Sequence, residues 1–111
     1  MEATPYFRGI ALFNQADFFE SHEVLEDVWR EAPVAEKRFV QALIQTAVAF
    51  HHYSKGNSAG ARSLLGRALR NFAGYPEEFG GINLVRLRLS IVQWQEALDQ
   101  GTAMPPLPVL R

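Results

Sequence analysis

The sequence predicts an all-α fold, a compact bundle of about five helices paired as antiparallel hairpins. Apolar residues recur three and four positions apart over long windows, as they do on one face of a helix. Proline and glycine separate these windows. The 111 residues are 48% hydrophobic, enough to bury a core without disulfides, and the chain has no cysteine. We therefore expect one helical domain over residues 1–111, with a proline-containing tail at about 101–111.

The first two helices are predicted from their start signals. A Thr-Pro pair at residues 4–5 favours a short helix that reaches about residue 14, because proline suits the first helical position. Asp17 and Glu20 have the spacing of a capping box, which predicts a second helix from there to about Glu31, before Pro33.

A third helix is expected from residue 34 or 35 to about residue 54. Its apolar residues spread over most of the helical circumference, which is typical of a central helix packed on several sides. They are Phe39, Val40, Leu43, Ile44, Ala47, Val48 and Phe50.

A fourth helix is predicted from residue 57 or 58 to residue 72, and a fifth from 83 to about 100, with a glycine-containing loop at 77–82. Residues 13–29 and 53–69, offset by forty positions, share a helix, tight turn, helix pattern. Such pairs resemble tetratricopeptide hairpins, although the full repeat signature is missing. The tail is expected to be extended, and either docks on the bundle or is loose.

Charge and composition exclude several classes of function. The net charge of −1 gives no global attraction for nucleic acid or an anionic membrane. The N-terminus lacks the pattern of a signal peptide, and no segment is apolar enough to span a bilayer. We expect a cytoplasmic protein without nucleic-acid or membrane partners, and a homodimer stays open.

Ionisable and large apolar groups share one face of the second helix. At about 100° per residue, His22 and Glu26 fall between Phe19 on one side and Phe18 with Trp29 on the other. Since aromatic residues usually mark the buried face, Trp29 is expected in the core, as is Trp94. The pattern thus predicts that His22 and Glu26 are buried and need polar partners.

The third helix carries a polar stripe of Gln41, Gln45 and His52 across its apolar surface. A short connection makes the second and third helices antiparallel neighbours. We therefore expect a candidate polar site of His22, Glu26, Gln45 and His52, with Glu23 and Gln41 as secondary candidates.

Three interpretations of this site remain open. It is a satisfied polar network that fixes helix register; or His22, Glu26 and His52 bind a divalent metal such as zinc, iron or manganese; or His22 and Glu26 act as general acid and base. The sequence does not decide whether the protein is an enzyme or a helical-hairpin module that binds a protein partner. No ligand or reaction is indicated.

The joint pattern over about residues 6–69 resembles a small bacterial and archaeal family called domain of unknown function three-hundred-nine. The resemblance rests on Phe13-Asn14, Phe19-Glu20-Ser21-His22-Glu23, Glu26, Trp29, Leu43-Ile44-Gln45, His52, Gly56-Asn57 and Ala61. It implies an all-helical bundle and no particular activity.

Overall fold

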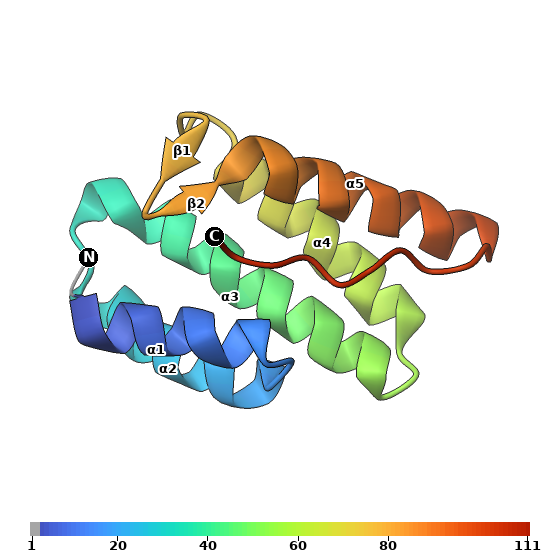
Figure 1. Ribbon diagram of the computed structural model, residues 1–111, viewed down its shortest axis with the longest axis horizontal. Helices are drawn as coiled ribbons and strands as arrows, with labels where there is room; N and C mark the ends of the chain where they lie inside the picture. Colours follow the sequence, from blue (N-terminus) through green and yellow to red (C-terminus); the bar gives the residue numbers. More distant parts are fainter. Residues whose placement is uncertain (1–2) are drawn as a thin grey trace.

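The computed structural model describes residues 3–111, and within this range the chain forms five helices and one short hairpin (Figure 1). The all-α prediction is confirmed. The elements are α1 (Ala3–Asn14), α2 (Phe18–Glu31), α3 (Val34–Ser54), α4 (Ser58–Phe72), β1 (Glu78–Phe79), β2 (Ile82–Asn83) and α5 (Leu84–Gln100).

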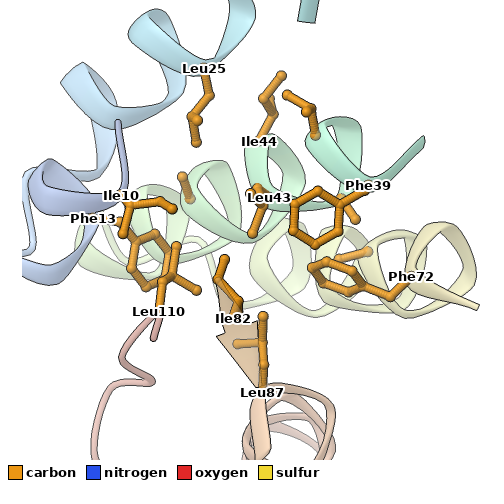
Figure 2. Close-up of a cluster of buried hydrophobic side chains, with 14 of the residues drawn as sticks. Ile10, Phe13, Leu25, Phe39, Leu43, Ile44, Phe72, Ile82, Leu87 and Leu110 are labelled. Carbon is orange, nitrogen blue, oxygen red and sulfur yellow. The ribbon is translucent and has the colours of Figure 1, made fainter. Parts of the chain in front are cut away.

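Each helix packs mainly against the next one along the chain, so α3 lies between α2 and α4 (Figure 1). This position explains why its apolar residues cover most of its circumference. Phe39, Val40 and Leu43 are completely buried, and Phe39 packs edge-on against Phe72 of α4, with ring centroids 5.9 Å apart (Figure 2). The predicted central helix is confirmed.

Side-chain caps define two of the helix starts. The Asn57 Oδ1 atom accepts a hydrogen bond from the Gly60 backbone N–H at 2.9 Å, and Asn83 Oδ1 accepts from the Arg86 N–H at 3.0 Å. Asp17 precedes α2 as expected, but its side chain makes no capping hydrogen bond. The predicted start of α2 is therefore right, while the capping box is wrong.

The segment expected as a loop between α4 and α5 contains the antiparallel hairpin β1–β2, in which Phe79 is paired with Ile82. Gly80 and Gly81 form its turn with φ of 59° and 78°, a conformation that glycine adopts without strain. The turn places Ile82 in the core near Leu87 (Figure 2).

Tyr6 links α1 to this hairpin. Its hydroxyl donates a hydrogen bond to the Gly80 carbonyl at 2.6 Å, and its side chain is buried. Burial, with a smaller contribution from the Glu36 carboxylate, raises the pKa of Tyr6 far above its ordinary value. The hydroxyl is therefore held in its neutral, donating form.

The segment after α5, residues 101–111, which we call the tail, is docked rather than loose. Gly101 ends α5 in the left-handed conformation, with φ of 65°, and the chain then runs back along the bundle to finish near β2 (Figure 1). Leu110 is buried among core side chains and lies beside Phe13 (Figure 2). None of the helices within residues 3–111 combines the length and apolarity needed to cross a membrane.

Candidate functional site on helix α2

The inner face of α2 is defined by close contact with α1. Phe18, Ser21, Leu25 and Val28 are buried on this face, and the Ser21 hydroxyl donates to the Gly9 carbonyl at 2.8 Å. A Cβ atom at Gly9 would lie 2.7 Å from Leu25 Cδ2, so only glycine permits this approach of the two helices. This contact determines which side of α2 is left to solvent.

The prediction that His22 and Glu26 are both buried is wrong for Glu26, whose side chain is 45% exposed; the His22 side chain is mostly covered, at 18% exposed, but lies outside the buried face. Phe19 and Trp29, which were taken to mark the core side, are themselves 50% and 36% exposed. The buried arc is instead centred on Leu25, so the predicted orientation of the helix was rotated; Trp94, the other tryptophan expected in the core, is buried.

His22 nevertheless makes two polar contacts on this outer side. Its Nε2 atom lies 3.1 Å from Glu26 Oε1, one helical turn later, and its Nδ1 atom lies 2.5 Å from the Phe19 carbonyl oxygen. Both neighbours are hydrogen-bond acceptors, so either ring nitrogen that carries a proton has a partner to which it donates.

The histidine that α3 places next to this part of α2 is His51. The Phe19 ring lies between two histidines, with centroids 4.9 Å from His22 and 5.3 Å from His51. His52 lies beyond His51, at 6.2 Å between ring centroids. The sequence analysis singled out His52 because it shares a stripe with Gln45, but one step along a helix turns a side chain by about 100°.

Gln45 lies in different surroundings from His22. Its Oε1 atom accepts a hydrogen bond from Asn71 Nδ2 of α4 at 2.9 Å, so it connects α3 to α4 rather than to α2. Gln41 is half-buried on the same helix. The asparagine was not among the predicted site residues, since nothing in its sequence context distinguishes it from a solvent-exposed polar residue.

Throughout the part of the chain that the structure describes, residues 3–111, no group of three or more His, Asp or Glu side chains is arranged to hold a metal ion. His22, Glu26 and His52 are therefore not gathered into a three-ligand site there. His22 with Glu26 supplies two ligands, fewer than the three protein ligands typical of catalytic zinc.

The outer side of α2 carries an open cleft of about 250 Å³. The residues that line it, which we call the outer face of α2, are Phe19, His22, Glu23, Glu26, Asp27 and Arg30. Arg30 forms an ion pair with Asp27 within this face. The secondary candidate Glu23 is exposed and belongs to the cleft. Chemically, the face combines one exposed aromatic ring with an excess of carboxylates.

Trp29 lies next to this face, and its ring makes a cation–π contact with Lys37. The Lys37 ammonium group stands 4.1 Å from the centroid of the Trp29 ring and also donates to the Trp29 carbonyl oxygen at 2.7 Å. Aromatic groups on this side of α2 therefore face solvent or a lysine from α3.

Comparison with known proteins adds a family and two relatives. The model of the family described as Domain of unknown function (DUF309) matches residues 6–64, which cover most of α1, all of α2 and α3, and the first half of α4. An uncharacterized protein of Aquifex aeolicus (strain VF5) is 36% identical over 77 residues, 68% of this chain and 23% of that protein. The uncharacterized protein YpuF of Bacillus subtilis (strain 168) is 44% identical over 55 residues, 49% of this chain and 32% of that protein. The chain thus corresponds to about a quarter to a third of these relatives.

Proposed function

The chain belongs to the DUF309 family, and from this premise we propose that it is a protein-interaction module whose outer α2 face binds a basic segment of a partner protein. The observation that carries the proposal is the exposed Phe19 ring set among carboxylates on a helix that packs against α1 and α3. No enzymatic activity is part of the proposal.

Phe19 supplies the apolar anchor. Half of its surface faces solvent although it is a large aromatic residue, and it is flanked by the His22 and His51 rings. Aromatic side chains with rigid surroundings are typical centres of protein interfaces, because little conformational entropy is lost when a partner covers them.

Charge indicates the chemistry of the partner. Helix α2 carries five acidic residues and a single arginine, and that arginine is paired with Asp27. Glu23 and Glu26 border the cleft around Phe19. Lysine or arginine side chains of a partner would therefore gain favourable contacts there, together with faster association.

The relatives support a modular role. In both of them the matching region accounts for a third of the protein or less. A compact helical domain joined to other sequence is typical of modules that bring a protein to its partner.

The experiment is an NMR titration of the ¹⁵N-labelled chain with a helical model peptide of alternating leucine and lysine clusters. We expect chemical-shift changes concentrated at Phe19, His22 and Glu23. The same peptide with glutamate in place of lysine should cause little change. Shifts spread over the molecule, or located on α4 and α5, would reject the proposal.

A matched pair of variants tests the charge argument. Glu23→Lys reverses one charge on the outer face of α2, whereas Glu96→Lys makes the same change at an exposed position of α5. Both alter the net charge equally, so only local complementarity separates them. Glu23→Lys should weaken peptide binding about three- to fivefold more than Glu96→Lys, since a lost rim contact is typically worth up to about 1 kcal/mol. Equal weakening would show that net charge alone attracts the peptide.

A further inference from the structure

We propose that the groove occupied by the tail is a second binding site, which accepts an extended proline-containing segment of another protein in place of the tail. The tail runs back alongside α5 toward the N-terminal part of the bundle (Figure 1), and the groove is lined by residues of α5, such as Leu87 and Trp94, and of α2 and α3, such as Phe18 and Tyr53. It is distinct from the outer face of α2, so this inference does not depend on the proposed function.

The groove holds the tail largely by its main chain. Asn14 Nδ2 donates to the Leu110 carbonyl oxygen at 3.1 Å, and the Leu110 N–H donates to Asn14 Oδ1 at 2.8 Å. Trp94 Nε1 donates to the Pro106 carbonyl oxygen at 3.0 Å. The Asn83 N–H and the Arg86 guanidinium both donate to the Arg111 carbonyl oxygen, at 3.1 and 2.9 Å. Main-chain contacts of this kind accept any extended segment, as in strand-addition and proline-rich recognition.

Side-chain selection is confined to a few positions. Pro108 and Leu110 are buried. Leu107, which precedes Pro108, and Val109, which lies between the two buried residues, are each 43% exposed. Proline at three of the four positions 105–108 restricts the unbound segment to extended conformations, which lowers the entropy lost on docking. The pattern that the groove selects is therefore Pro, any residue, Leu, with prolines before it.

The tail leaves part of the groove unfilled on both of its sides. A cleft of about 350 Å³ lies between the tail and the α5 residues Arg86, Ser90 and Gln93. Another of about 440 Å³ lies between the tail and the aromatic residues Phe18, Tyr53 and Trp94. A segment with a larger apolar side chain at the position of Leu107, which borders both clefts, would bury more surface than the tail does.

Because the better-fitting segment differs from the tail at the Leu107 position, the occupant is a different protein rather than a second copy of this chain. The tail is covalently attached, so its effective concentration at the groove is about millimolar or higher. The tail of another copy has the same contacts and no such advantage. Only a segment that fits better, through a larger side chain at the Leu107 position, displaces the tail at ordinary concentrations.

The test uses the full chain and fluorescein-labelled peptides measured by fluorescence polarisation. The first peptide has the sequence of residues 104–111, Met-Pro-Pro-Leu-Pro-Val-Leu-Arg, and the second carries Leu107→Phe.

In the chain, Leu110→Ala weakens the docked tail, and Val109→Ala changes a neighbouring exposed side chain as the matched control. Leu110→Ala should lower the dissociation constant for the first peptide at least about tenfold, because the competing tail is released. Val109→Ala should leave it within about twofold, since surface truncations have small effects. The Leu107→Phe peptide should bind more tightly than the first peptide to every variant.

Three results would overturn the proposal. The peptide binds the folded Leu110→Ala variant no better than the wild type; or Leu110→Ala with Asn14→Ala binds it as tightly as Leu110→Ala alone; or light scattering shows that the chain exchanges tails and forms dimers. If Leu110→Ala does not fold, the test is an NMR titration of the wild-type chain with excess Leu107→Phe peptide. Binding in the groove should then shift the indole N–H resonance of Trp94 and not that of Trp29, and an unchanged Trp94 resonance would overturn the proposal.

Discussion

The Asn14 side chain and the Leu110 backbone are joined by two hydrogen bonds across 96 positions of the sequence. The amide of Asn14 takes the place that a neighbouring β-strand would occupy, since it satisfies both the N–H and the carbonyl group of one residue. The last turn of α1 is thereby tied to the end of the tail, and Leu110 is held against Phe13. One asparagine thus connects the family-matched part of the chain to the segment outside it.

Asn14→Ala should lower the free energy of unfolding by about 1 to 3 kcal/mol, because both polar groups of Leu110 lose their partner in a partly buried place. Urea unfolding followed by circular dichroism measures the change. Gln15→Ala, at the exposed neighbouring position, is the control and should have little effect. An unchanged unfolding midpoint for Asn14→Ala would show that the tail does not depend on this pair.

Two glycines on different helices should respond to alanine in opposite directions. At Gly9 the added Cβ would lie 2.7 Å from Leu25 Cδ2 and 2.8 Å from Leu25 Cγ, and Leu25 is completely buried, so Gly9→Ala should cost about 1 to 3 kcal/mol. At Gly66 the nearest atom is Gln95 Nε2 at 3.5 Å, and α4 continues through this position. Gly66→Ala should therefore stabilise the protein by about 0.5 to 1 kcal/mol, the usual gain from replacing a helical glycine.

Urea unfolding of both variants beside the wild type gives the two signs in one experiment. If Gly9→Ala is neutral, the contact between α1 and α2 is looser than the structure shows. A destabilised Gly66→Ala would instead indicate that the Cβ disturbs the packing between α4 and α5.

The same contact between α1 and α2 explains where sequence reasoning succeeded and failed. Helix ends follow from local signals such as Asn57 and Pro33, so the five helices could be predicted within a few residues, whereas the short hairpin between α4 and α5 was expected as a loop. The orientation of α2 depends instead on how closely α1 approaches at Gly9, which is a tertiary property. Periodicity alone could not show that Phe19 and Trp29 face outward, because large aromatic residues are more often buried.

The partners of the predicted site residues differ from those expected for a related reason. Two polar stripes on neighbouring helices need not face each other, and here Gln45 bonds to Asn71 of α4 while His22 pairs with Glu26 of its own helix. Of the two histidines of α3, the one that contacts Phe19 is His51, which was not among the predicted site residues. The polar residues could be found from sequence, whereas their partners required the packing.

Replacing the Tyr6 hydroxyl tests the link between α1 and the hairpin. Tyr6→Phe should cost about 1 kcal/mol near neutral pH, because the Gly80 carbonyl loses its donor. Burial raises the pKa of Tyr6 in the folded state, with Glu36 adding to the effect. Below the ordinary tyrosine pKa of about 10, both states hold the proton and stability does not depend on this group.

Above that pH, the unfolded chain releases the Tyr6 proton while the folded chain keeps it, so the unfolding free energy falls as pH rises. The loss approaches about 1.4 kcal/mol per pH unit. Tyr6→Phe lacks this group, so the difference in stability between wild type and variant should shrink or reverse between pH 9 and pH 11. Urea unfolding at both values measures it, and a constant difference would mean that Tyr6 ionises normally in the folded protein.

A pair of double-mutant cycles separates the polar network that the sequence predicted from the one in the structure. Gln45 and Asn71 form a direct hydrogen bond between α3 and α4, so combining Gln45→Ala with Asn71→Ala should reveal a coupling of about 0.5 to 1.5 kcal/mol. Gln45 is bonded to Asn71, whereas His22 contacts the Phe19 carbonyl oxygen and Glu26. Gln45→Ala and His22→Ala should therefore be additive within about 0.5 kcal/mol. Because His22 is paired with a carboxylate that is 45% exposed, His22→Ala alone should cost about 1 kcal/mol or less. Strong coupling between Gln45 and His22 would restore a shared polar cluster between α2 and α3. Additivity would instead assign Gln45 to the packing of α3 on α4 and His22 to the outer face of α2.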